Sequence, residues 1–115
     1  MGCATKQEIE AQKLPLVRLS PPQIATVQLA VRAVLPRADG RYSFKGYRAG
    51  KNPDGTIMVC GWATGPDNEG FPSHHVYTGV LNLKGEFTNV RSAYQGTSIS
   101  LACFTKGVGL QAWED

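Results

Sequence analysis

The chain of 115 residues has no run of eighteen apolar residues, so we expect no membrane-spanning helix. It also lacks a G-x-S-x-G motif, a phosphate-binding P-loop and a G-x-G-x-x-G motif. The charged fraction of 18% and the hydrophobic fraction of 42% are ordinary for globular proteins and argue against a disordered chain. A chain of this length is expected to form one domain with one modest core.

Histidine is scarce, and the two histidines, His74 and His75, are adjacent. Neighbouring side chains in an extended segment point to opposite sides, so this pair cannot clamp one metal ion. No H-x-x-x-H or C-x-x-C spacing supports a metal site. A serine next to histidines, as at Ser73, is far more often a loop contact than a nucleophile with its base. We therefore expect no enzymatic activity, no metal site and no cofactor.

The most strand-like run is residues 56–64, which we place at the centre of a small antiparallel sheet. Alternation puts Cys60 on the core side of this strand, and it puts Cys103 on the core side of a last strand predicted over 98–105. Two cysteines that point into one core can pair where their strands are neighbours or nearly so. The disulfide would close a loop of about 43 residues and contribute about 4 kcal/mol. The alternative is two buried free thiols in a reducing compartment.

A helix is predicted over residues 21–35. Ser20 is its N-cap, Pro21 takes the first helical position and Gln23 completes a capping box. Apolar residues then recur at helical spacing until Pro36 ends the helix. Strands are expected at 41–49, 56–64, 76–83, 86–93 and 98–105. The predicted fold class is α+β, with one N-terminal amphipathic helix packed on a four- to five-stranded antiparallel meander sheet.

Basic residues are concentrated in one stretch, since residues 32–51 hold six basic residues and one acidic residue. In the strand predicted there, Tyr42 and Phe44 should face one side and Tyr47 the other, among basic side chains. We assign contact with an anionic surface to Arg37, Arg41, Lys45, Arg48 and Lys51. Basic and aromatic side chains together suit single-stranded nucleic acid. The same surface can meet anionic lipid headgroups instead, and the simplest alternative is a solvated edge strand.

Residues 65–75 are rich in glycine and proline, and we predict a long connection there. Loops of this kind often carry function. Phe71, flanked by Gly70 and Pro72, is compatible with an exposed aromatic anchor that enters a partner's groove, as in a protease inhibitor or an immunity protein. It is equally compatible with a ring that folds back onto the end of the core. The predicted loop contacts are Phe71, His74 and His75.

The chain starts with Met1 and then Gly2-Cys3-Ala4. This tripeptide resembles the end of a bacterial lipobox, in which small residues precede a cysteine that becomes lipidated. The resemblance to small envelope lipoproteins of Gram-negative bacteria implies a longer precursor with a signal peptide, a diacylglyceryl group on Cys3 and sorting to the outer membrane. Two alternatives stay open: myristoylation of Gly2 with palmitoylation of Cys3, and an unmodified terminus.

The expected organisation is therefore a lipid anchor and flexible tether at residues 1–19, followed by a single α+β domain at residues 20–115. We predict a non-enzymatic lipoprotein on the periplasmic side of the cell envelope, anchored through Cys3, with a disulfide-braced domain that contacts proteins or the envelope surface. The alternative is a soluble binding module. It would be an inhibitor or immunity-type protein that uses the Phe71 loop, or a nucleic-acid binder that uses the Arg41–Lys51 strand.

Overall fold

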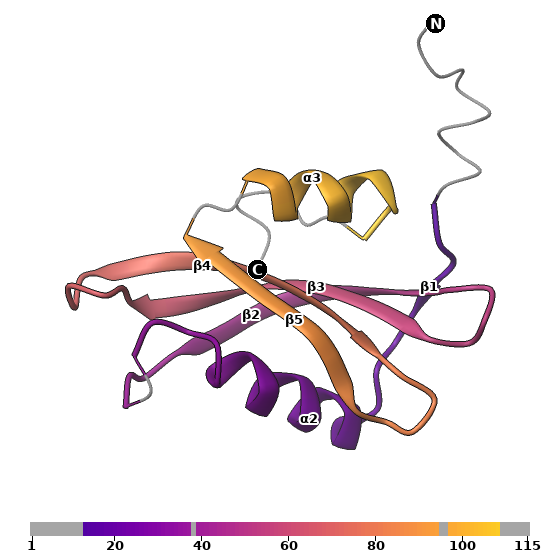
Figure 1. The fold of residues 1–115 in the computed structure, drawn as a ribbon, viewed down its shortest axis with the longest axis horizontal. Helices are drawn as coiled ribbons and strands as arrows, with labels where there is room; N and C mark the ends of the chain where they lie inside the picture. Colours follow the sequence, from indigo (N-terminus) through magenta and orange to yellow (C-terminus); the bar gives the residue numbers. More distant parts are fainter. Residues whose placement is uncertain (1–12, 38, 95–96, 109–115) are drawn as a thin grey trace, which may run out of the picture.

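The computed structural model describes residues 13–37, 39–94 and 97–108 (Figure 1). Within them the chain forms an α+β fold, a five-stranded antiparallel sheet with two helices. The strands lie in sequence order, and Figure 1 shows α2 and α3 on opposite faces of the sheet. The antiparallel meander is confirmed, and the prediction of one helix is corrected to two. The elements are β1 (Leu16–Val17), α2 (Pro21–Arg32), β2 (Ser43–Lys51), β3 (Ile57–Pro66), β4 (Pro72–Leu81), β5 (Phe87–Tyr94) and α3 (Thr97–Thr105).

Helix α2 begins at Pro21 because Ser20 caps it. The Ser20 hydroxyl accepts a hydrogen bond from the N–H of Gln23 (3.4 Å), and the Gln23 side chain accepts one from the N–H of Ser20 (2.8 Å). The two residues thus satisfy two donors that a helix start leaves open. Val27 and Val31 form the buried side of the helix. It ends before the predicted position 35, because the N–H groups that follow bond three residues back, in a tighter turn.

The three hairpin turns that connect β2 to β5 share one design. Each begins with Asn or Asp and has glycine three residues later, and the glycine N–H donates to the carbonyl oxygen of the first residue. The glycines have φ between 83° and 92°, a conformation that side chains rarely adopt. The turns start at residues 52, 67 and 82, which places them fifteen residues apart.

The predicted long connection at 65–75 is wrong. β3 continues to Pro66 and β4 starts at Pro72, and these two prolines face each other in the register, so residues 67–71 alone join the strands. Proline is tolerated at a strand end because its missing N–H is not needed in the ladder there. His74 and His75 consequently lie in β4 rather than in a loop.

The predicted strand at 98–105 is also wrong, because these residues belong to α3. Ile99 and Cys103 are four residues apart, a spacing that puts them on one side of a helix as well as of a strand. Both are buried, whereas Leu101, which was expected beside them, is 64% exposed. Cys103 reaches the sheet from the helix and forms a disulfide with Cys60, with an S–S distance of 2.06 Å. The predicted disulfide is therefore present, but Cys103 lies in a helix instead of the predicted strand.

Two buried clusters lie on the two faces of the sheet. The α3 cluster lies between α3 and the sheet and consists of Cys60, Val76, Ile99, Cys103 and Val108. The larger α2 cluster lies between α2 and the sheet and consists of Leu19, Val27, Val31, Leu35, Tyr42, Ala49, Val59, Ala63, Tyr77, Leu81 and Phe87.

A bulge in β2 changes the face of one aromatic ring. The register between β2 and β3 shifts between Phe44 and Tyr47, so both rings pack against the α2 cluster. The prediction that Tyr47 faces away from Phe44 is therefore wrong. Gly46 lies within the shifted stretch, and a glycine inside a strand commonly marks a bulge.

The described part of the predicted tether lies against the domain. Leu16 and Val17 form the edge strand β1 beside β2, and Leu19 is buried. Cys3 and the rest of the predicted anchor, residues 1–12, lie outside the described residues.

Candidate functional site

The turn of the β3–β4 hairpin, residues 67–71, presents Phe71 to solvent with 63% of the residue exposed. The Asp67 carboxylate accepts hydrogen bonds from the backbone N–H groups of Glu69 (2.9 Å) and Phe71 (3.0 Å), which hold the backbone next to the ring. The alternative in which Phe71 folds back onto the core is wrong. An exposed ring on a fixed backbone loses little conformational entropy on binding, so the turn is suited to recognition.

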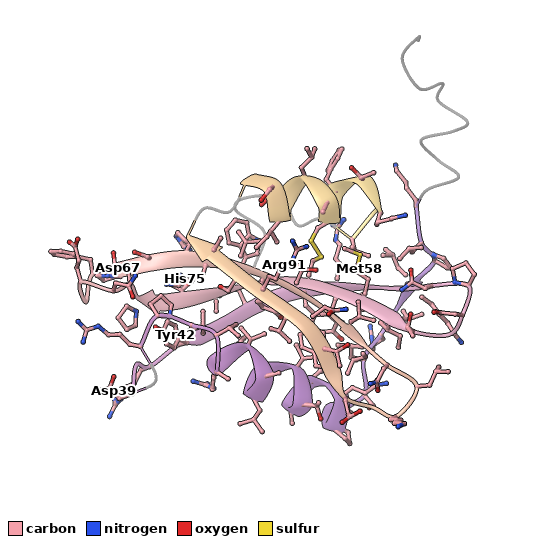
Figure 2. All side chains as sticks on the ribbon, viewed as in Figure 1. Asp39, Tyr42, Met58, Asp67, His75 and Arg91 are labelled. Atoms are coloured by element: carbon pink, nitrogen blue, oxygen red, sulfur yellow. A yellow bond between two sulfur atoms is a disulfide. The ribbon has the colours of Figure 1, made fainter. Side chains whose placement is uncertain are left out.

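Side chains from the segment before β2 hold this turn in place. The Arg37 guanidinium donates from Nε to the carbonyl oxygen of Asp67 and from Nη2 to that of Asn68, both at 3.2 Å. The Tyr42 hydroxyl donates to the carbonyl oxygen of Pro66 (2.7 Å) and accepts from the N–H of Arg37 (3.0 Å). Figure 2 shows Tyr42 and Asp67 at the same end of the molecule. The amino-terminal half of the turn is therefore connected to the segment that precedes β2.

Hydrogen bonds to Asp67 stabilise its charged form. The N–H of Phe71 is the largest cause, and the N–H of Glu69 and the hydroxyl of Ser73 add to it, so the pKa of Asp67 is lowered although desolvation opposes the shift. The Ser73 hydroxyl donates to Asp67 Oδ2 (3.3 Å) and to the carbonyl oxygen of Phe71 (3.2 Å). Ser73 therefore stabilises the turn through these two hydrogen bonds.

His74 and His75 point to opposite faces of β4, as expected for neighbours in a strand. His75 is 1% exposed; its Nε2 lies 3.3 Å from the carbonyl oxygen of Gly65, and its ring meets the Tyr42 ring edge-on at 5.7 Å. His74 is exposed, with Nδ1 3.3 Å from the Thr64 hydroxyl. Among the described residues, no three His, Cys, Asp or Glu side chains are grouped so that they could hold a metal ion.

The basic residues assigned to an anionic surface do not form one surface. Arg37 belongs to the contacts that hold the hairpin turn, Arg41 precedes β2, and Lys45 lies in the β2 bulge. Arg48 and Lys51 point to opposite faces, as their register partners in β3 show: Arg48 lies on the α3 face and Lys51 on the α2 face. Arg48 and Lys51 therefore cannot contact one flat surface together.

The aromatic rings of the same stretch are not available for base stacking. Tyr42 is 7% exposed, and Phe44 and Tyr47 pack against the α2 cluster. The Arg32 guanidinium lies over the Phe44 ring, 5.0 Å from its centroid, and the Tyr47 hydroxyl accepts a hydrogen bond from the N–H of Leu19 (3.0 Å). The nucleic-acid hypothesis loses its stacking component, because that component needs exposed rings.

An open groove of about 610 Å³ on the α3 face was not predicted. Its lining includes Met58, Thr78, Val80 and Arg91, which share this face by their register, and Figure 2 shows Met58 and Arg91 on the side of α3. Thr78 is buried, with its hydroxyl 3.3 Å from the Cys60 sulfur. Arg91 adds a positive charge to the lining of the groove. Side-chain alternation in the predicted strands 56–64 and 86–93 could have indicated that these residues share a face.

Neither helix of the described chain has the length and hydrophobicity needed to cross a bilayer. Comparisons of the chain with protein-family models, with curated proteins and with solved structures give no match.

Proposed function

We propose that this chain is a non-enzymatic lipoprotein of the bacterial cell envelope, anchored through Cys3, whose disulfide-braced domain binds a protein partner through the hairpin turn at residues 67–71. The observation that carries the proposal is Phe71, a large ring that is 63% exposed on a backbone held by Asp67 and Arg37. Aromatic anchors on preorganised backbone are typical of the residues that dominate binding energy in interfaces.

The cysteines support the location. The bond between Cys60 and Cys103 leaves Cys3 as the odd cysteine. Disulfides persist in oxidising compartments such as the bacterial periplasm. An extracytoplasmic domain with a cysteine in a lipobox-like tripeptide is the expected arrangement for an envelope lipoprotein. Ala4, which follows the cysteine, favours sorting to the outer membrane.

A soluble inhibitor or immunity-type protein is the second candidate, and the same exposed Phe71 favours it. The two candidates share the binding surface and differ in the chemistry of Cys3. Nucleic-acid binding is less well supported, because the rings of Tyr42, Phe44 and Tyr47 belong to the core.

The first test is the intact mass of the protein from its native host, with thiol labelling before and after reduction. The proposal predicts added acyl mass on Cys3 and two further labels that appear after reduction. A chain with a Cys60–Cys103 bond and an unmodified Cys3 would favour the soluble module. Three thiols that label without reduction would contradict the Cys60–Cys103 bond and the oxidising compartment inferred from it.

The second test is site-specific photo-crosslinking in native envelope. A photoreactive residue at Phe71 should give a discrete protein adduct. Leu83 is a matched control, because it is 75% exposed in a turn of the same design. Equal adducts from both positions, or none from position 71, would contradict the proposed binding surface.

A further inference from the structure

The side of α3 that points away from the sheet exposes two large apolar residues next to the exposed Ser98 and Thr105. Leu101 and Phe104 are 64% and 72% exposed and lie three residues apart, so their side chains are neighbours on one side of the helix. The opposite side carries Ile99 and Cys103, which are buried. No residue of Thr97–Thr105 is charged. A helix on a water-exposed surface normally carries charged residues on its outer side, so an uncharged helix with two large exposed apolar residues is unusual.

α3 is held firmly in position. The disulfide joins Cys103 to β3, and the fully buried Val108 donates its N–H to the carbonyl oxygen of Cys103 (3.0 Å). Figure 1 shows the helix lying along its face of the sheet, with its other side outward. Leu101 and Phe104 are therefore presented on a rigid support and cannot turn inward without moving the disulfide.

Two of the described residues bring positive charge close to this helix. Arg91 is exposed on the α3 face, and Lys106 is exposed directly after the helix. Every acidic residue that the structure describes lies in a turn or loop, and none belongs to α3. These residues are Asp39, Asp54, Asp67, Glu69 and Glu86. The outer side of α3 thus combines apolar side chains with neighbouring cations.

The amino-terminal segment approaches the same end of the molecule. The N–H of Leu14 donates to the carbonyl oxygen of Lys106 (2.9 Å), so the described chain starts beside the carboxyl end of α3. Lys13 lies ten positions after Cys3, and a chain of that length spans at most about 35 Å. A lipid on Cys3 would therefore keep this end of α3 within about 35 Å of the membrane. This step rests on the proposed function.

We propose that the outer side of α3 lies on an anionic lipid bilayer, with Leu101 and Phe104 at the boundary between headgroups and acyl chains and with Lys106 and Arg91 against lipid phosphates. Apolar side chains flanked by cations are how peripheral helices bind such surfaces. A protein partner is less well supported, because two side chains of this size supply a few hundred Å² at most, whereas a stable protein interface needs roughly 800 Å² from each partner.

The test uses the full chain with Cys3→Ser, which carries no lipid, and measures co-sedimentation with vesicles. Binding is expected on vesicles of phosphatidylglycerol and phosphatidylethanolamine and not on phosphatidylcholine. The double variant Leu101→Ser, Phe104→Ser should weaken the partition coefficient about tenfold or more. Lys106→Gln should weaken it about fivefold. The matched control is Leu29→Ser, Leu83→Ser, since both residues are exposed away from α3, and it should bind like the parent.

Three outcomes would overturn the proposal. The first is vesicle binding that the α3 double variant does not reduce. The second is self-association of the parent that the double variant abolishes, which would make a second copy the occupant. The third is binding that appears after truncation behind Val108, which would make the chain's own last residues the occupant. The native mass of Cys3 is measured separately, so failure of the anchor and failure of this surface are distinguishable.

Discussion

The two faces of the sheet are stabilised by different means. Of the described residues, eleven buried hydrophobic ones form the α2 cluster, and α2 contains no cysteine, so this face is stabilised by burial and by the helix cap. On the other face five buried hydrophobic residues form the α3 cluster, and two of them, Cys60 and Cys103, form the disulfide. Burial suffices for the face with the larger cluster, and the smaller one depends on a covalent bond.

This difference also bears on what each helix can expose. The pattern of side chains orients α2, whose Val27 and Val31 pack on the sheet while Leu29 is 73% exposed. A helix held by a disulfide is oriented by the bond, so its outer side is free to carry Leu101 and Phe104. The disulfide explains how a nine-residue helix without charges can occupy a defined place on the sheet.

Removal of the disulfide should give the largest effect on stability. The bond closes a separation of 43 residues, and the double variant Cys60→Ala, Cys103→Ala should lower the free energy of unfolding by about 4 kcal/mol. Urea unfolding of the oxidised, reduced and variant proteins measures this. Hydrogen exchange should show that α3 loses protection before α2 does. Equal protection of both helices after reduction would contradict the comparison.

Substitution of one leucine on each side of the molecule should separate buried from exposed positions. Leu81→Ala, in the α2 cluster, should cost about 3 kcal/mol, because it removes a buried side chain and leaves a cavity. Leu101→Ala on α3 should change the free energy of unfolding by less than about 0.5 kcal/mol. Urea midpoints of the two variants test this. Similar losses would mean that the outer side of α3 is covered within the domain.

Loss of the α2 cap should have a smaller effect. Ser20→Ala removes the acceptor for the N–H of Gln23 and should cost about 1 kcal/mol. The matched control is Thr26→Ala in the same helix, since the Thr26 hydroxyl only donates to the carbonyl oxygen of Pro22 one turn earlier (3.0 Å). We expect this control to be neutral or slightly stabilising in thermal unfolding. A larger loss from the control would show that the capping box is not what defines the start of α2.

Acid should loosen the hairpin turn and leave both faces of the sheet folded at first. The pKa of Asp67 is lowered in the folded protein, so its contribution is present above the unfolded value of 3.8 and is lost as the pH falls through the folded value. The amide signals of Glu69 and Phe71 should therefore shift in NMR spectra as the pH falls below 3.8.

Asp67→Asn tests the assignment of that titration. The variant should abolish the pH dependence at Phe71 and leave the one at Thr56, where Asp54 accepts hydrogen bonds in another turn and also has a lowered pKa. If Phe71 still titrates in the variant, a different group controls the turn.

The sequence alone determined features that depend on neighbouring residues. Ser20, Pro21 and Gln23 specify the start of α2 through contacts within four residues. The turns could also be predicted from local sequence, because Asn or Asp with glycine three residues later recurs at 52–55, 67–70 and 82–85. This repeat would have corrected the long loop predicted at 65–75. The position of Cys60 on the core side of its strand followed from alternation.

The tertiary structure alone decided what depends on distant partners. Residues 98–105 have Ile99 and Cys103 at a spacing that fits both a strand and a helix, and the place of α3 over the α3 cluster, with the disulfide to Cys60, selects the helix. The bulge in β2 likewise turned Tyr47 to the face of α2, because strand register is set by pairing with β3. Local rules act through nearby backbone groups, whereas a face or a register is settled only when the whole sheet is assembled.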